Sequence, residues 1–530
     1  MVRGKRTVGL KRARHNDEGS EVMQHASRRI RGAITLVLAL AATVPAWAET
    51  DRETLSVVTN AEPVSLDLTS TRDPPATLTT MINVTEALWD KTLDGQPAPG
   101  LASWESSADG MEITFHLRRN VKFQSGDAFT AKDVVFSFER AASKAIMAGR
   151  HFRFIDHVRA VDDETVEVSF KAPDVAFLPW NGVFIASKAY YDRVGEEAFV
   201  RHPVGTGPYA VTDYASGQYL QLKAFDGYWG QKPQVRSARF TFVKDDNTRV
   251  AKLRAGEADI IMNTPYSAAA ELKALGYRLR NLASYPTVSL QFQLANTGTP
   301  WSDARVRLAI AEAIDADAMV KSLFFGQPNR YPGLTPGEIG YDPTLKPYPY
   351  DAAGAKKLLA EAGYPGGFRM PLYYPTGAFY GAQETADTVV LYLNAVGIDV
   401  QAQALDITQF MGNLMKVRHD ATARYVAVAA MPMASMADPT EALTGAYYSK
   451  SPFTLSDAPP LDLLIDAALN DLDKAQRAKD IGAAIRLIHD QVYTIPLWDT
   501  VAVYAMKSSV DYEPTERSFP VLRLRNVSLH

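Results

Sequence analysis

The chain contains no cysteine among its 530 residues. This absence excludes disulfide bonds, thiolate metal sites, a cysteine nucleophile and a lipid-modified cysteine. Long apolar runs are also missing, because no stretch after the N-terminal segment reaches the roughly 18 residues that a transmembrane helix needs. What remains is ordinary globular composition, with 46% hydrophobic and 22% charged residues. A chain of this length is expected to fold as several domains or lobes.

Sequence signatures of catalysis are absent too. No G-x-S-x-G, H-E-x-x-H or H-x-x-x-H pattern occurs, and no G-x-G-x-x-G opens a predicted helix. Gly205-Thr-Gly207 lacks the lysine and the spacing of a P-loop. The acidic runs 162–164 and 245–246 lie at a predicted turn and a predicted helix start, where solvated carboxylates are common. The sequence therefore predicts neither an enzyme nor a metal or cofactor site.

The N-terminus has the features of an export signal. A basic cluster at 28–31 precedes an apolar run of about a dozen residues from Ile34 to Val44. Ala46-Trp-Ala48 matches an A-x-A cleavage site, so residues 1–48 are predicted to be a signal peptide with an N-terminal extension, cleaved after Ala48. An internal start at Met23 would give a signal of conventional length. Arg28-Arg29 leaves twin-arginine export open beside the Sec route.

The charge of the chain and its predicted export together indicate where the protein acts and which partners it lacks. Residues 1–48 hold 9 Lys/Arg and 3 Asp/Glu, so the predicted mature chain keeps 47 basic and 57 acidic residues, a formal net charge of −10. An acidic exported protein is a poor candidate for binding nucleic acid or an anionic membrane. We expect a periplasmic protein with no lipid anchor and no nucleic-acid partner.

The hydrophobic pattern indicates an α/β fold. A strand over 237–243, a helix over 247–256 and a strand over 258–262 follow one another, as in α/β lobes. Strands are also predicted at 55–59, 101–104, 112–117, 165–170, 288–294, 370–374, 398–404 and 495–504, and helices at 81–89, 302–320, 351–363, 383–395, 461–472 and around 481–488.

One segment is more distinctive than the rest. Ile113, Phe115 and Leu117 alternate with polar residues as in a strand with one buried face. A loop follows, and then Thr130 with Asp133 three residues on resembles a capping box that starts a helix. This pattern predicts a strand, a turn and a helix, and by itself no chemistry.

As a string, the segment resembles the hallmark of the extracytoplasmic solute-binding proteins of ABC importers, family 5, which bind dipeptides, oligopeptides or nickel. Further matches occur in the order typical of the family, at 99–104, 109–118, 129–138, 203–209, 225–229, 303–307, 313–315 and 358–363. The resemblance implies a two-lobed clamshell of the type II kind, which closes on a solute and delivers it to an ABC permease. It implies a monomer that performs no covalent chemistry.

The resemblance also implies a domain division. Crossover segments are expected near 288–296 and 495–504. Residues 49–290 with 500–530 would form lobe I, including an extra subdomain at about 95–205. Residues 297–494 would form lobe II.

The ligand position is less clear than the fold. In peptide-binding members an aspartate before a turn pairs with the ligand's α-amino group, and here Ser435 occupies the corresponding position, three residues before Asp438. A serine cannot offset the cost of a buried ammonium. Either Asp438 or Glu62 reaches in, or the ligand has no free amine. A standard peptide ligand is therefore disfavoured but not excluded.

Other cleft residues are expected on loops and strands that face the hinge. The predicted ligand-binding set shares aromatic and hydrogen-bonding side chains and comprises Asn60, Glu62, Trp180, Asn181, Tyr373, Tyr374, Ser435, Asp438, Trp498 and Asp499. Such a pocket suits a peptide-like compound, an opine-like compound or an oligosaccharide. Two alternatives stay open: an exported hydrolase on an α/β scaffold, and a sensory or chaperone protein of the same binding fold.

Overall fold

The computed structural model describes residues 54–69, 74–92, 95–144, 152, 154–179, 182–376, 378–418, 420–431, 438–451, 453–456, 458–514 and 520–530. Helices and strands alternate through these ranges, so the predicted α/β class is confirmed. Among the described residues, no helix combines the length and the apolar character needed to cross a membrane. The predicted signal peptide lies outside the described residues.

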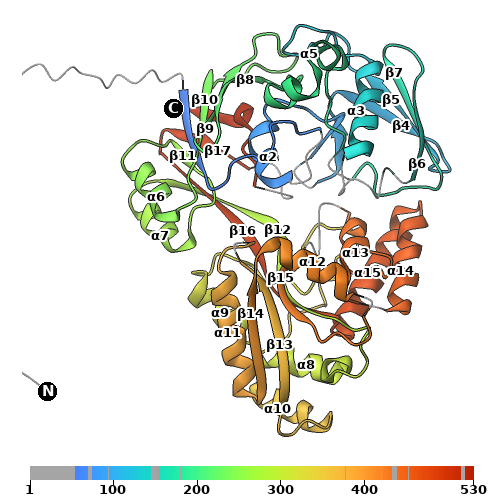
Figure 1. The fold of residues 1–530 in the computed structure, drawn as a ribbon, viewed down its shortest axis with the longest axis vertical. Coiled ribbons are helices and arrows are strands. Elements are labelled where there is room, and N and C mark those ends of the chain that lie inside the picture. Colours follow the sequence, from blue (N-terminus) through green and yellow to red (C-terminus); the bar gives the residue numbers. More distant parts are fainter. Residues whose placement is uncertain are drawn as a thin grey trace, which may run out of the picture. The chain divides into compact units, whose positions relative to one another are not determined.

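A ten-stranded sheet forms the centre of the described chain (Figure 1), in the order β14-β13-β15-β12-β16-β11-β1-β10-β9-β8. Its strands are β1 (Thr54–Thr59), β8 (Tyr209–Ala215), β9 (Tyr219–Ala224), β10 (Ser237–Phe242), β11 (Ile260–Ile261), β12 (Arg278–Phe292), β13 (Phe368–Pro375), β14 (Ile398–Leu405), β15 (Val426–Met431) and β16 (Thr494–Met506). β10, β1 and β11 run parallel in one half, and β14, β13 and β15 run parallel in the other.

The two longest strands, β12 and β16, connect these halves. They pair with each other antiparallel, and β16 also pairs with β11 while β12 also pairs with β15. Their register shifts between Ala283 and Thr287 and again between Val288 and Ser289. Such irregularities bend a strand and increase its twist locally. The sheet is therefore continuous but irregular where its halves meet.

Helices cover each half of the sheet. In the first half these are α2 (Pro74–Met81), α6 (Asp246–Arg254) and α7 (Tyr266–Ala274). In the second half they are α8 (Ala304–Ala313), α9 (Ala316–Leu323), α10 (Ala352–Glu361), α11 (Ala382–Ala395) and α12 (Ile407–Val417). Separate apolar cores form beneath them, with Leu55, Phe240 and Tyr504 in one and Leu290, Leu372 and Val428 in the other.

A smaller four-stranded sheet has the order β4-β5-β7-β6, and α3 (Ala131–Lys144) packs on it. Its strands are β4 (Ala102–Ser106), β5 (Glu112–Leu117), β6 (Ile155–Ala160) and β7 (Thr165–Phe170). Ile113, Phe115 and Leu117 are all buried, as the alternation predicts. The backbone N–H of Thr130 donates to the Asp133 carboxylate over 2.9 Å, so the predicted helix start is confirmed.

Two predicted helices differ from the structure. The segment 81–89 is not helical, because α2 ends at Met81 and β2 (Trp89–Lys91) follows. The side chain of Asn83 explains this ending: its amide donates to the carbonyls of Thr80 and Leu522 and accepts from the N–H of Leu524. These long-range bonds hold the chain in a turn, which no local pattern reveals.

The predicted helix 302–320 is two helices, α8 and α9, that meet at Asp315. The Asp315 carboxylate accepts the N–H of Ala318 over 2.8 Å and caps α9. An aspartate followed by helix-forming residues is a recognisable N-cap signal. The apolar residues continue at helical spacing across both helices, so their pattern did not indicate the break between α8 and α9.

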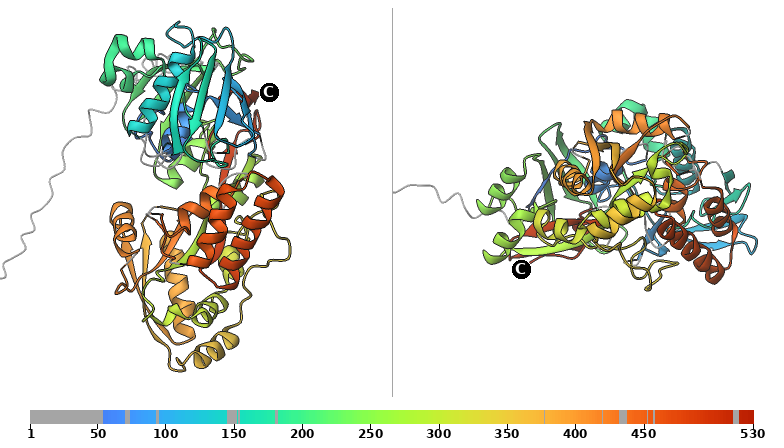
Figure 2. Two further views of the ribbon diagram at one scale, coloured as in Figure 1. Left: turned by 90° about the vertical axis from the view of Figure 1, so that its right-hand side faces the viewer. Right: turned by 90° about the horizontal axis from the view of Figure 1, so that it is seen from below.

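The remaining elements lie outside the two main sheets or at their edges. They are β3 (Pro97–Pro99), α5 (Lys188–Arg201), α13 (Thr440–Ala446), α14 (Pro459–Asn470), α15 (Lys474–Asp490), β17 (Val510–Tyr512) and β18 (Val527–Leu529). Figure 2 shows α14 and α15, in orange-red, packed side by side. Leu461, Ile465 and Ile485 form the apolar contact between them.

Candidate functional site

Strands from both halves of the sheet end near the middle of β16. In the first half, Ile261 pairs with Ala505, the N–H of Thr264 donates to the carbonyl of Val503, and the hydroxyl of Tyr266 donates to the carbonyl of Val501. The chain after β11 thus runs along β16 toward Asp499. Ligands of open α/β sheets bind beyond the carboxyl ends of parallel strands, which makes this region the candidate site.

The second half reaches the same point. Thr287 of β12 is the register partner of both Met431, the last residue of β15, and Asp499 of β16. Directly paired residues share one face of a sheet. Asp499 therefore lies in a row with the end of β15, from which residues 432–437 continue.

Asp499 is the unusual residue of this row. Its side chain is buried, with 7% exposed. Its Oδ1 accepts the hydroxyl of Thr287 over 2.6 Å, while Oδ2 has no hydrogen-bond partner within the described ranges. Burial raises the pKa of Asp499 to about 7, against the lowering effect of the Thr287 hydrogen bond. The carboxyl group is thus desolvated and half satisfied.

The other predicted residues divide between the two faces of the sheet. Tyr373 stacks on Tyr425 with ring centroids 4.5 Å apart, and it pairs with Ala427. Tyr374 and Trp498 instead belong to the apolar core, where Trp498 lies 4.6 Å from Phe324 between ring centroids. Burial raises the pKa of Tyr374. Tyr373 thus lies on the same face of the sheet as Asp499 and Thr287. Tyr374 and Trp498 pack in the core on the other face.

Asn60 and Glu62 follow β1. The Asn60 side-chain oxygen accepts the amide of Asn263 over 2.7 Å, so two amides meet at the carboxyl ends of β1 and β11. Glu62 lies against the β8–β9 hairpin, where its Oε1 accepts Ser216 Oγ and the N–H of Gly217, each over 2.9 Å, and also the Tyr214 hydroxyl. These bonds overcome the effect of burial and lower the pKa of Glu62.

Asp438 is tied to the scaffold. Its side chain is 2% exposed, and Oδ2 accepts Arg477 Nη2 over 2.5 Å. Oδ1 accepts the N–H of Thr440 over 3.0 Å and the hydroxyl of the same residue. Both oxygens are therefore used within the protein. Trp180, Asn181 and Ser435 lie outside the described residues.

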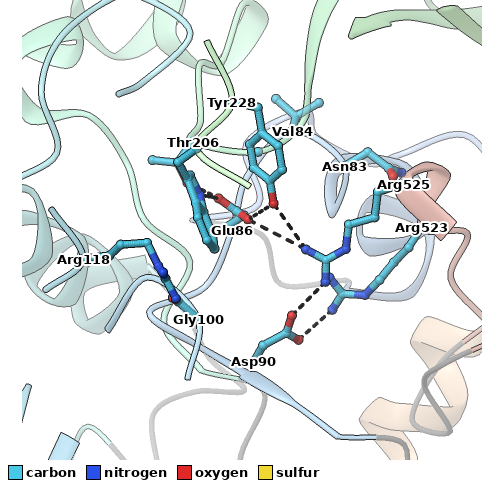
Figure 3. A network of polar contacts seen from close by, with 12 residues as sticks. Asn83, Val84, Glu86, Asp90, Gly100, Arg118, Thr206, Tyr228, Arg523 and Arg525 are labelled. Atoms are coloured by element: carbon cyan, nitrogen blue, oxygen red, sulfur yellow. Dashed lines mark hydrogen bonds and ion pairs between the residues drawn. The ribbon is translucent and has the colours of Figure 1, made fainter. Parts of the chain in front are cut away.

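A second polar cluster was not foreseen from the sequence (Figure 3). Glu86 accepts hydrogen bonds from Thr206 Oγ1 at 2.8 Å and from Tyr228 Oη and Trp229 Nε1 at 2.9 Å each. Asp90 pairs with Arg523 and Arg525, each at 3.0 Å. Burial raises the pKa of Glu86, whereas the two arginines outweigh burial and lower the pKa of Asp90.

The two acids and two arginines of this cluster line a cavity of about 250 Å³, together with Trp89 and Phe184. The arginines and the carboxylate that they pair with come from segments more than 400 residues apart in sequence. The cluster therefore holds the C-terminal segment against the region after α2. Gly205 fits the same junction closely, because a Cβ there would lie 2.1 Å from the carbonyl oxygen of Val84. The cluster therefore works as scaffold.

Comparison with known proteins decides the family. A sequence model of the bacterial extracellular solute-binding proteins, family 5 (middle), matches residues 96–453. The chain belongs to this family. Its members are binding proteins and not enzymes, so the resemblance inferred from the sequence motifs is confirmed.

Curated relatives include the glutathione-binding protein GsiB of Pectobacterium atrosepticum and of Escherichia coli O1:K1, each 34% identical over 313 residues. These alignments cover 58% of this chain and 60% of each relative, so the chain matches less than two thirds of their length.

Solved structures match over a longer stretch. The periplasmic binding protein DppA of Helicobacter pylori, in complex with the peptide STSA, is 26% identical with a TM-score of 0.75, covering 90% of this chain and 98% of that one. AgaA of A. tumefaciens R10, in complex with agropinic acid, is 27% identical with a TM-score of 0.74, covering 90% and 99%. The predicted two-lobed binding-protein fold is confirmed.

Proposed function

We propose that this protein is the periplasmic substrate-binding component of an ABC importer, which captures a peptide-like or other small polar solute and delivers it to permease subunits in the inner membrane. Membership of the solute-binding family is the observation that carries the proposal. Relatives named for binding glutathione, a peptide and agropinic acid support a solute of amino-acid-derived chemistry.

The mechanism that fits this chain is closure about β12 and β16. We propose these strands as the crossovers between lobe I (49–290 with 500–530, including the subdomain at about 95–205) and lobe II (297–494). The register between β12 and β16 shifts from Ala283 to Thr287 and from Val288 to Ser289, so few hydrogen bonds join the two strands there. Bending at this point therefore disturbs few bonds. A solute that contacts both lobes favours the closed state by its higher affinity for that state.

We also propose where the protein acts. Residues 1–48 act as the export signal, and the mature monomer acts outside the inner membrane without nucleic-acid partners. Asn60, Trp180, Asn181, Tyr373, Ser435 and Asp499 remain the proposed ligand-binding set. Tyr374 and Trp498 pack in the apolar core, and Glu62 and Asp438 are bonded within the protein. Asn60, at the end of a strand, and Asp499, on the β12–β16 ladder, have the strongest support.

The test uses the mature chain, residues 49–530, purified from the periplasm without refolding. Small-angle scattering and thermal unfolding are measured with glutathione, a set of dipeptides and opines. A bound solute should reduce the radius of gyration and raise the melting temperature, since at 100 times Kd binding adds about 2.7 kcal/mol of stability. If no solute has either effect and none co-purifies, the proposed function is wrong.

A further inference from the structure

Two buried aspartates elsewhere in the described chain are each paired with a buried arginine. Asp67 pairs with Arg140 at 2.5 Å, and both side chains are less than 5% exposed. Asp438 pairs with Arg477 at the same distance. A buried carboxylate without a cation is costly, and these partners offset that cost.

Asp499 has no such partner among the residues that the structure describes. There, its side chain accepts one hydrogen bond, from the neutral hydroxyl of Thr287 to Oδ1, and Oδ2 receives none. Arg330 contacts the same strand at the carbonyl of Leu497, but its guanidinium pairs with Asp317 at 2.7 Å. Tyr266, near Val501, has its pKa raised to about 12 by burial and stays neutral. No cation in the described part of the chain pairs with Asp499, so its carboxylate is open to a cation carried by a solute.

The position of Asp499 indicates which cation. Through Thr287 it is in register with the end of β15, immediately before residues 432–437. Ser435 in that segment occupies the position at which peptide-binding relatives are expected to carry an amine-binding acid. Of the two replacements considered from the sequence, Asp438 is paired with Arg477, and Glu62 is bonded through Oε1 to the β8–β9 hairpin at the far edge of the sheet. Asp499 is the carboxylate that the fold leaves available in this row.

We propose that Asp499 Oδ2 receives the ammonium group of the bound solute, so that the solute class is one with a free amino group. This inference rests on the proposed function. Thr287 holds Oδ1 and thereby fixes the orientation of the carboxylate, while the buried setting strengthens the ion pair.

The experiment compares Asp499→Asn with the wild type and with Asp226→Asn, a control on an exposed turn whose carboxylate is 75% exposed beside Arg236. The probes are glutathione and a panel of dipeptides, each paired with its N-acetyl form, and affinity is measured by calorimetry at pH 8. Wild type and control should bind at least one free-amine probe and reject its acetylated form. Asp499→Asn should weaken that binding by about 100-fold or more, as expected when one partner of a buried charge pair is lost.

A second readout separates recognition from a structural role. Because Asp499 titrates near pH 7 when free, binding an ammonium below that pH must displace a proton. Wild-type affinity should fall toward tenfold per pH unit below pH 7, and calorimetry in buffers of different ionisation enthalpy should detect the released proton. Asp499→Asn should lose this proton release.

The outcomes distinguish the two proposals. Equal binding of free and acetylated probes, binding of acetylated probes alone, or unchanged affinity in Asp499→Asn would overturn the role of Asp499 and leave the receptor function intact. Failure of every free-amine probe, together with a co-purified solute that has no amino group, would also overturn it. If no solute of any kind binds or co-purifies, the proposed function itself fails.

Discussion

Asp438 and Asp499 are both buried aspartates, yet their surroundings are opposite. Asp438 has an arginine on one oxygen and Thr440 on the other. Asp499 has Thr287 on one oxygen and no partner among the described residues on the other. A carboxylate saturated within the chain stabilises the fold and has no capacity left for a ligand. A half-satisfied one destabilises the free protein and retains that capacity, a common compromise at binding sites.

The largest effect on stability is expected when Asp438 loses the cation that pairs with it. Arg477→Met should destabilise the protein by about 3–5 kcal/mol, because it leaves an uncompensated buried charge. Urea unfolding of the mature chain at pH 7 measures the loss. A change below about 1 kcal/mol would mean that Asp438 is better solvated than its 2% exposure indicates.

Glu86 offers a second saturated carboxylate. In Glu86→Gln the amide keeps one acceptor but turns an N–H₂ group toward donors among Thr206, Tyr228 and Trp229. Loss of these bonds should cost about 1–3 kcal/mol in the same assay. Glu105→Gln, the same substitution at an exposed position of β4, is a matched control that should stay within about 0.5 kcal/mol. Equal effects in both variants would contradict the scaffold role of the cluster.

Asp499→Asn should act in the opposite direction. The pKa of Asp499 is raised in the folded state, so between pH 4 and 7 the folded protein holds a proton that the unfolded chain releases. Its stability contribution therefore falls as pH rises to about 7 and stays low above it. Asparagine removes this penalty, so the ligand-free variant should be more stable than wild type by about 1–2 kcal/mol at pH 8.

The difference between this variant and wild type should shrink as pH falls to 5, where Asp499 is protonated. Differential scanning calorimetry of solute-free protein at the two pH values measures it. A variant that is less stable than wild type at pH 8 would show that the ionised carboxylate helps the fold, contrary to the comparison with Asp438.

Local patterns predicted much of the fold. Alternation located β5 and β7 at their observed bounds, and Thr130 with Asp133 located the start of α3, because these signals depend on neighbouring residues. Patterns failed where distant contacts decide the structure. Asn83 ends α2 through bonds to Leu522 and Leu524. β12 begins ten residues before the predicted strand because β16 pairs with residues 278–283 as well as with the segment from Thr287 onward.

The site was only partly accessible from the sequence. Placing Asp499 and Trp498 near the return strand was possible, but alternation alone did not show that Trp498 packs in the core while Asp499 pairs with Thr287. Similarly, nothing near Asp438 in sequence indicates that Arg477, 39 residues later, takes its charge. Which carboxylate stays open is a property of the folded network.

Native mass spectrometry tests most directly whether Asp499 receives an ammonium group of the solute. The mature chain is purified from the periplasm without refolding, and wild type and Asp499→Asn are compared side by side. The account predicts that wild type retains a small solute with a free amino group and that the variant emerges empty. A retained solute without a basic nitrogen, or the same occupancy in both proteins, would contradict it.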